Sequence, residues 1–334
     1  MSLPLMYGLA AQYPQAEIHV ILKQEHRCAF RLLPGFERMK IWHFDKRDQP
    51  GPIALKRFCE KMRATMGEID IFFALPPSFS SALMGWFLKA KERVGYSSQN
   101  RSFLLTHVYE KPQGVHRSNE YFTLLNRFLK RELNFPHWEP PVIDHNFIPP
   151  VPAYLVMNPN SNASSRRMPL TRWPELAGFF SNRDFVITGT EADRERVAQL
   201  IADLKRQVPR NRYHNLAGRT SVLDLIALFA NSEGVLSNDS GPAHLAHLLG
   251  VPSLVFFGAG DPVNTGPYYG TGPALVMRQE NLPCAPCLKN VCPLGTLDCL
   301  KALDFQLYQD QIRNLFPTKE TESEIPLVAK AASL

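Results

Sequence analysis

The sequence lacks the long apolar run that a membrane-spanning helix requires. Among its 334 residues, no stretch approaches the roughly 20 consecutive apolar residues that cross a bilayer. No basic segment followed by an apolar one marks a secretory signal peptide. We therefore expect a cytoplasmic protein without a transmembrane segment. Apolar residues make up 45% of the chain and charged residues 20%, as in ordinary globular proteins.

Cysteine is also sparse, and six residues in a chain of this length exclude a secreted disulfide scaffold. Four of them form a C-x₂-C-x₄-C-x₆-C array: Cys284, Cys287, Cys292 and Cys299. This spacing is tighter than the separated pairs typical of zinc sites. A structural zinc is therefore the lesser alternative to loop packing or redox-labile thiols. No set of serine, cysteine and histidine residues indicates a covalent nucleophile.

Two motif classes are missing as well. No G-x-G-x-x-G follows a predicted strand, which argues against a dinucleotide oxidoreductase. There is no Asp-x-Asp metal clamp, and Glu68-x-Asp70 borders a predicted strand, where a structural role is expected. The formal charge of +6 suits an anionic partner such as a nucleotide diphosphate, a phosphorylated glycan or an acidic membrane surface. Without cations interleaved with aromatics, it does not indicate nucleic acid.

Strands and helices alternate along both halves of the chain. In the first half we predict strands at 17–22, 39–44 and 69–75 and helices at 52–66, 80–89 and 120–133. In the second half we predict strands at 154–157, 184–188, 213–216, 235–237 and 253–257 and helices at 170–180, 191–205, 221–231 and 241–249. This alternation predicts α/β domains with parallel sheets covered on both faces.

A proline-rich segment separates the two halves. Six prolines between Asn134 and Ala153 block both helix and central strand, so we interpret this segment as the interdomain connection. We expect an acceptor-side domain at 1–148, a nucleotide-sugar domain at 149–304, and a helix and tail at 305–334. Ligands of parallel sheets bind at the carboxyl ends of the strands. The predicted site is therefore a cleft that the two domains face.

The segment Asn238-Asp-Ser-Gly-Pro-Ala-His244 carries the strongest chemical signal. Ser240 is a candidate helix cap, and the helix start after Gly241 can accept a diphosphate through its unpaired N–H groups. Asp239, at the tip of the strand, is placed to meet sugar hydroxyls, and His244 lies one turn into the helix. From local chemistry alone, a capped helix without ligand is the commoner case for such residues.

The run from Asn215 to Pro262 resembles the signature region of glycosyltransferase family 9, the heptosyltransferases of the lipopolysaccharide inner core. Both Asn-Asp-Ser-Gly-Pro-x-His and the later Phe-Gly-x-x-Asp-Pro match that region. The resemblance covers nearly the whole chain, more weakly before residue 150. It implies a GT-B fold of two Rossmann-like domains that face each other across a cleft. It also implies inversion at the anomeric carbon and no required cofactor.

The resemblance also implies donor-binding residues beyond that block. The loop after the first strand of the second domain contributes Asn160, Ser161 and Asn162. Arg166-Arg-Met-Pro169 stands where the family has Lys-Arg-Trp-Pro, so Arg166 is expected to bind the diphosphate of the donor. The segment Arg172-Trp-Pro174 is similar to the same family element. In the alignment with the family it falls in the middle of a helix, so we assign it no role in donor binding.

Three further groups of positions are assigned with alternatives. Asp193 matches an acid that holds the donor ribose, but it also complements the dipole of its own helix start. Thr220 matches a position beside the nucleotide, or it caps the following helix. Ser78, Ser80 and Arg101 match the acceptor side, with helix capping and surface charge as the alternative.

The family opens with a strand and a Gly-Asp turn whose aspartate is the catalytic base. Met1 to Ala16 is instead typical of the helix after that turn, so we expect the first strand and the base to lie upstream of Met1. The expected activity is transfer of a heptose or related sugar, from ADP-heptose, to a lipopolysaccharide-type glycolipid at the inner face of the membrane. The enzyme is then cytoplasmic or peripheral at that membrane. The alternative is a nucleotide- or glycan-binding protein without turnover.

Overall fold

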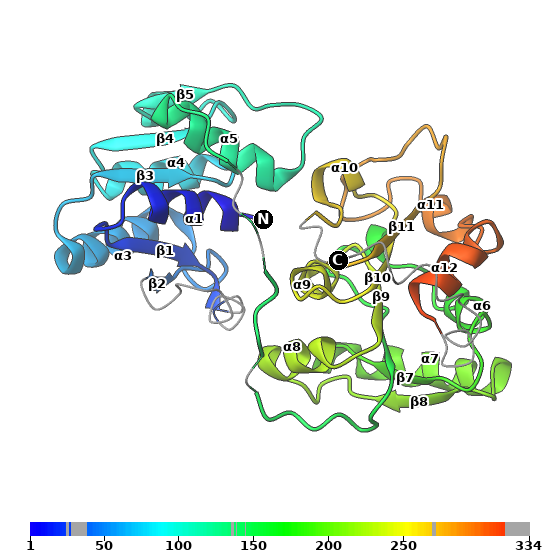
Figure 1. Ribbon diagram of the computed structural model, residues 1–334. Coiled ribbons are helices and arrows are strands. Elements are labelled where there is room, and N and C mark those ends of the chain that lie inside the picture. Colours follow the sequence, from blue (N-terminus) through cyan, green and yellow to red (C-terminus); the bar gives the residue numbers. More distant parts are fainter. Residues whose placement is uncertain are drawn as a thin grey trace. The chain divides into compact units, whose positions relative to one another are not determined.

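The computed structural model describes residues 1–24, 27, 39–134, 137, 139–143, 145–268 and 272–317. The chain divides into two compact units, Met1–Trp138 and Glu139–Leu334, and the division falls within the proline-rich segment. Within the described residues, no helix is both long and apolar enough to cross a membrane. Both units alternate strands and helices, as the sequence predicts (Figure 1).

The first unit contains two parallel sheets. In chain order its elements are α1 (Leu3–Gln12), β1 (Ile18–Leu22), β2 (Met39–His43), α3 (Gly51–Met66), β3 (Ile71–Ala74), α4 (Phe79–Phe87), β4 (Glu92–Tyr96), η3 (Ser102–Leu104), β5 (His107–Tyr109) and α5 (Arg117–Leu129). Strands β1 and β2 pair with each other, and β3, β4 and β5 form the second sheet. The strands β4 and β5 are present in the structure but were not among the strands predicted from the sequence.

The second unit is built on one sheet of six parallel strands, in the order β11-β10-β9-β6-β7-β8. Its strands are β6 (Leu155–Asn158), β7 (Asp184–Ile187), β8 (Arg212–Asn215), β9 (Gly234–Asn238), β10 (Ser253–Phe257) and β11 (Ala274–Arg278). Its helices are η4 (Ser164–Arg166), α6 (Arg172–Ala177), η5 (Glu191–Asp193), α7 (Arg194–Gln207), α8 (Val222–Ala230), α9 (Gly241–Leu248), α10 (Pro262–Thr265), α11 (Asp298–Lys301), η6 (Gln306–Tyr308) and α12 (Gln309–Leu315).

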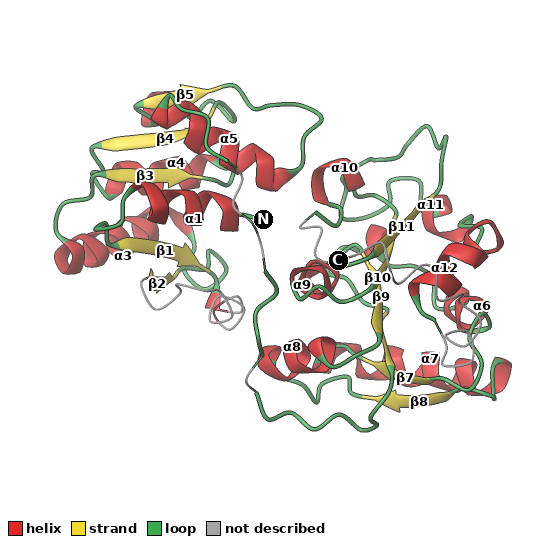
Figure 2. Cartoon of the chain, in the orientation of Figure 1, coloured by secondary structure: helices red, strands yellow, loops and turns green. Residues whose placement is uncertain are grey.

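Helices cover this sheet on both faces, with α9 on one side and α11 and α12 on the other (Figure 2). The strands β6, β7, β9 and β10 are buried along their whole length, which explains why apolar residues dominate them in the sequence. Trp173 and Phe256 pack edge to face in the core, with ring centroids 5.6 Å apart. The predicted fold class, α/β with parallel sheets, is confirmed.

The strand order reverses between β6 and β9. From β6 the chain adds β7 and β8 on one side, and β9, β10 and β11 then follow on the other. At such a reversal the connections leave the carboxyl edge in opposite directions, which opens a crevice where parallel sheets bind their ligands. Asn158, the last residue of β6, is in register with Ser237 near the end of β9. The predicted donor residues lie at this edge.

Candidate functional site

The central polar residue at the reversal is Asn158, which the sequence prediction did not select. Its amide Nδ2 donates to the carbonyl of Asn160 at 3.3 Å, to Ser237 Oγ at 3.1 Å and to Ser240 Oγ at 3.2 Å. A buried amide at the end of an otherwise apolar strand was the available signal. Asn158 thereby ties the loop after β6 to the start of α9.

The Ser240 prediction needs a correction. Ser240 is the N-cap residue of α9, but its hydroxyl makes no capping bond and instead accepts from Asn158. Gly241 begins the helix exposed, and a Cβ placed there would have nothing within 4 Å. His244 lies half-buried one turn inside. The helix start therefore faces open space, as an anion site on backbone N–H groups requires.

Arg166 lies in the short helix η4 and reaches back to β9. Its Nη1 atom is 3.2 Å from Oδ2 of Asp239, and the Asp239 side chain is only 1% exposed. The Arg166 side chain is 30% exposed, although its Nε atom is buried and has no hydrogen-bond partner among the described residues. Asp239 was expected to meet sugar hydroxyls. In this structure its carboxylate forms an ion pair with Arg166, and its contact with a sugar stays a prediction.

Backbone contacts hold the Arg166 loop against the ends of β9 and β10. The buried Asn238 Oδ1 accepts from the backbone N–H of Met168 at 3.0 Å. A Cβ on Gly260 would overlap the Asp239 carboxylate, so only glycine allows the loop after β10 to pass so close. These contacts lie between segments far apart in the sequence, and of the four residues only Asp239 was predicted as a site residue.

The loop 160–162 divides into buried and exposed positions. Asn160 is buried, and its Nδ2 donates to the carbonyl of Thr188 at 3.1 Å. Ser161 accepts through its carbonyl from Arg167 Nε, and Asn162 is exposed. Asn160 therefore shapes the loop, whereas Asn162 is the side chain that is accessible to a ligand.

Asp193 and Thr220 were each predicted with two alternatives. The Asp193 carboxylate accepts from Thr190 N at 2.9 Å and from Thr190 Oγ1 at 2.6 Å, a capping box that favours the structural alternative. Asp193 also lies beside Gly189, next to Asn160. Thr220 is not the cap of α8, because Ser221 occupies that position and accepts from Asp224 N. Thr220 is half-buried, and its place beside a nucleotide stays a prediction.

The side chain of Arg172 contacts other residues than the side chain of Arg166 does. Arg172 is the first residue of α6 rather than a mid-helix residue, which corrects the expected register. Its guanidinium carbon lies 4.7 Å from the Phe305 ring centroid, and it donates to the carbonyl of Leu303. It also pairs with Glu175 at 2.6 Å. Arg172 therefore stabilises the packing of α6 away from the crevice.

On the acceptor side, Arg101 is wholly buried, and its guanidinium is bound to carbonyls. It donates to Tyr96 O at 3.0 Å and Ser78 O at 3.0 Å, and also to Ser81 Oγ at 2.7 Å. The prediction that Arg101 touches an acceptor is therefore wrong. Ser78 and Ser80 are half-buried, with their hydroxyl oxygens 3.2 Å apart, and Ser80 also accepts from Lys46.

The four-cysteine array forms a loop beside the Arg166 loop. Its thiols line one pocket together with Ser165 and Gly258. Ser165 N donates to Asn290 O at 3.2 Å, which joins the two loops. Across the described part of the chain, no group of three or more His, Cys, Asp or Glu side chains is arranged to hold a metal ion.

The thiols differ in acidity. Backbone N–H groups of residues 294–297 donate to Cys292 and lower the pKa of its thiol. Burial raises the pKa of Cys299 to about 11, and the three neighbouring thiols add to that shift. Cys292 is therefore the more reactive nucleophile of the two.

Comparisons with known proteins agree on one family. The model of glycosyltransferase family 9 (heptosyltransferase) matches residues 57–297. The lipooligosaccharide heptosyltransferase 2 of Campylobacter jejuni is 26% identical over 265 residues, which are 76% of this chain and 77% of that protein. The lipopolysaccharide heptosyltransferase 1 of Pseudomonas aeruginosa is 34% identical over 142 residues, 42% of this chain and 37% of that protein. The structure of E. coli ADP-heptose LPS heptosyltransferase II has a TM-score of 0.72 at 21% identity, covering 96% of this chain and 95% of that one.

Proposed function

Because the chain belongs to glycosyltransferase family 9, we propose that it transfers a heptose from ADP-heptose to a lipopolysaccharide-type glycolipid. Curated relatives that share about three quarters of its length are heptosyltransferases of lipooligosaccharide. The observation that carries the proposal is the ion pair of Arg166 with the buried Asp239, which holds a cation beside the open start of α9. Residues 1–148 are assigned to the acceptor side and 149–304 to the donor side.

In this mechanism the acceptor hydroxyl attacks the anomeric carbon from the face opposite the diphosphate. Its oxygen forms the new bond, its proton passes to a base, and the bond from the anomeric carbon to the diphosphate oxygen breaks with its electrons. Arg166 and the N–H groups at Gly241 are proposed to receive the negative charge that develops on the leaving ADP. Attack from the opposite face inverts the anomeric centre.

The guanidinium is suited to this role because its planar fork can bind two phosphate oxygens. A charge-assisted hydrogen bond contributes about 1.5–3 kcal/mol, so Arg166 and the helix start supply the electrostatic stabilisation that we propose in place of a required metal. Asp239 contributes by holding the guanidinium in one orientation before the donor arrives.

The test is incubation of the full chain with ADP-heptose and a core glycolipid that lacks heptose. Release of ADP together with one heptosyl addition to the glycolipid, seen by mass spectrometry, is expected. The anomeric configuration of the product, read by NMR, tests inversion. If the chain binds ADP but releases no ADP from the sugar nucleotide, the proposed transferase activity is wrong, and the chain is a binding protein instead. Faster release from a UDP- or GDP-sugar would overturn the donor assignment.

A further inference from the structure

Residues 284–297 lie between β11 and α11, and we call this segment the cysteine loop. It holds three of the four spaced cysteines and contains neither helix nor strand. Its large apolar side chains are mostly exposed: Leu288 by 63%, Val291 by 69% and Leu294 by 62%. Apolar burial therefore contributes little to holding the middle of this loop against the second unit.

Hydrogen bonds join the cysteine loop to the residues just before Arg166. The Ser165 side chain is buried, its backbone N–H donates to Asn290 O at 3.2 Å, and its hydroxyl donates to Lys289 O. Ser164 Oγ donates to the same Asn290 carbonyl at 3.2 Å. Separating the two segments would leave these polar groups without their partners, which is costly for the buried ones. The cysteine loop therefore fixes the position of η4.

The cysteine loop also contacts the backbone beside Asp239. The backbone N–H of Leu288 donates to Ala259 O at 2.8 Å. Gly260 comes next in the chain, and a Cβ placed on it would overlap the Asp239 carboxylate. The loop thus contacts the segments that carry both partners of the Arg166–Asp239 ion pair.

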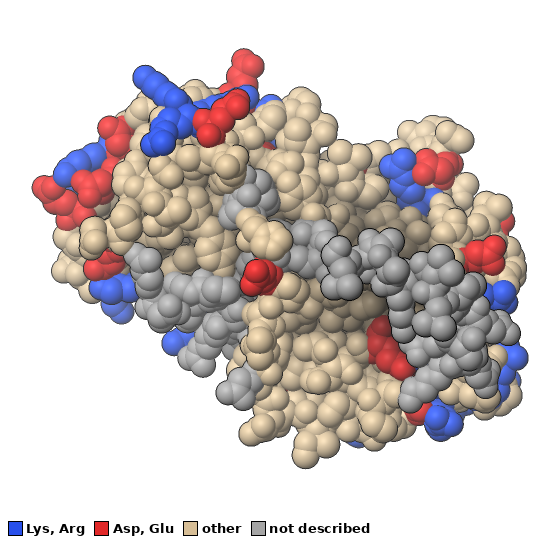
Figure 3. All heavy atoms as spheres, in the orientation of Figure 1, with Lys and Arg blue, Asp and Glu red and all other residues tan. Residues whose placement is uncertain are grey.

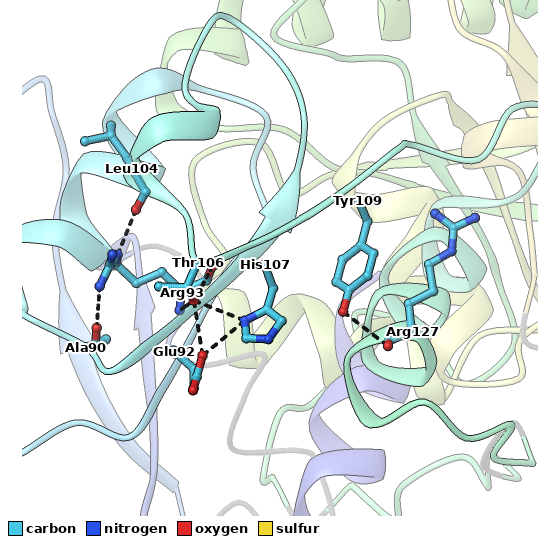
Figure 4. A network of polar contacts seen from close by, with 8 residues as sticks. All are labelled: Ala90, Glu92, Arg93, Leu104, Thr106, His107, Tyr109 and Arg127. Carbon is cyan, nitrogen blue, oxygen red and sulfur yellow. Dashed lines mark hydrogen bonds and ion pairs between the residues drawn. The ribbon is translucent and has the colours of Figure 1, made fainter.

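The side chain of Arg166 has few contacts of its own. Among the described residues, its guanidinium has one polar partner, the Asp239 carboxylate at 3.2 Å. Arg93, in β4, is the opposite case, because its Nε donates to Leu104 O at 2.8 Å and its Nη1 to Ala90 O at 2.7 Å (Figure 4). A guanidinium with a single partner turns or withdraws when its backbone shifts. The position of Arg166 therefore depends on the backbone of η4.

The Arg166–Asp239 pair differs from ion pairs at the surface. On the face drawn in Figure 3, several cations lie directly beside acids. Exposed pairs contribute little, because both side chains move freely and solvent screens their charges. The Asp239 side chain is only 1% exposed, so it cannot follow an arginine that shifts. A displaced backbone at Arg166 would therefore weaken this pair.

We propose that the cysteine loop positions Arg166 for the diphosphate, and that Ser165 is the positioning residue through which it acts. The inference rests on the proposed function, in which Arg166 receives the charge of the leaving ADP. A binding group has to be held within about 0.5 Å of its productive position. The hydrogen bonds of Ser165 restrain η4 before the donor arrives, so less conformational freedom is lost on binding. Because Ser165 is buried, it acts through Arg166 rather than on the donor itself.

The test is a double-mutant cycle on the full chain, with the affinity for ADP measured by isothermal titration calorimetry. Ser165→Ala should weaken ADP binding about fivefold, because its hydrogen bond to Lys289 is lost and η4 gains freedom. In the Arg166→Ala background the same change should cause no further loss, since no guanidinium is left to position. Ser164→Ala, at an exposed position, should weaken binding about twofold, again only when Arg166 is present.

The matched control is Ser232→Ala. Ser232 Oγ also donates to a backbone carbonyl, that of Phe229 at 2.8 Å, just after α8. This variant should leave the affinity for ADP unchanged, and thermal melting measures the stability of each variant separately. If Ser232→Ala weakened ADP binding as much as Ser165→Ala, the loss would reflect general stability and the proposal would be wrong.

Two further outcomes would overturn the positioning role. One is an unchanged affinity for ADP in both Ser165→Ala and Ser164→Ala. The other is an equal loss of affinity with and without the Arg166 guanidinium. If Ser165→Ala does not fold, the cycle with Ser164→Ala decides alone. Failure of the proposed function looks different: Arg166→Ala itself would then bind ADP as tightly as the parent chain.

Discussion

The guanidinium of Arg166 lies 3.2 Å from the carboxylate of Asp239, although the two residues follow different strands, β6 and β9. These strands are neighbours at the reversal of the sheet order. The Asp239 side chain is 1% exposed and the Arg166 side chain 30%, so the arginine is the more accessible partner of the pair. A buried acid that aims an accessible cation is a preorganised site for an anion.

Arg166→Ala should weaken ADP binding by about ten- to a hundredfold, because a charge-assisted hydrogen bond contributes about 1.5–3 kcal/mol. Isothermal titration calorimetry measures the affinity of each variant for ADP. The matched control is Arg172→Ala, which removes an arginine six positions away that packs on Phe305. It should lower the melting temperature and leave the affinity unchanged. Equal loss of affinity in both variants would show that the register of the donor loop is misassigned.

Gly241→Ala should weaken ADP binding while leaving the melting temperature unchanged or slightly higher. The added Cβ meets nothing within 4 Å in the protein, and alanine is the better helix former by about 1 kcal/mol. It would occupy the space that we assign to the diphosphate. Gly260→Ala is the contrasting change, since its Cβ overlaps Asp239, and it should lower the melting temperature by several degrees. Unaltered affinity in Gly241→Ala would place the diphosphate elsewhere.

Asp184 should make part of the stability depend on pH. Hydrogen bonds from Arg212, and then from His214, hold the pKa of its carboxyl below the ordinary value of 3.8. The lowered pKa means that the ionised form stabilises the fold above pH 4 or so, and that this contribution is lost as pH falls through the folded pKa. Asp184→Asn should therefore melt earlier than the parent at neutral pH. The difference should shrink in acid, as differential scanning fluorimetry can follow. A difference constant with pH would argue against this ion pair.

Cys292 should react with iodoacetamide faster than Cys299. Backbone N–H donors lower the pKa of the Cys292 thiol, whereas burial raises that of Cys299 to about 11. Only the thiolate is nucleophilic, so near neutral pH the first should be alkylated well before the second. Peptide mass spectrometry after short exposures reads both sites in one sample. Preferential labelling of Cys299 would contradict the acidity that the backbone donors imply.

The sequence by itself determined the elements of the second unit that are buried on both faces. Strands β6, β7, β9 and β10 exclude water along their whole length, so apolar residues dominate each of them. The family motif, whose residues meet the ligand through local backbone geometry, was equally visible. Arg166 and Gly241 could be selected because their neighbours in the chain define their register.

Only the tertiary structure decided which polar side chains are available to a ligand. Arg101 has the appearance of a surface cation in sequence, yet it is wholly buried against carbonyls. Asn158 was not selected as a site residue, yet its amide joins β6 to β9 and to Ser240. Burial and pairing depend on contacts between segments about 25 to 80 residues apart, and no local pattern encodes them. For the same reason Ser240, which local propensity assigns to helix capping, has its hydroxyl taken by a residue of another strand.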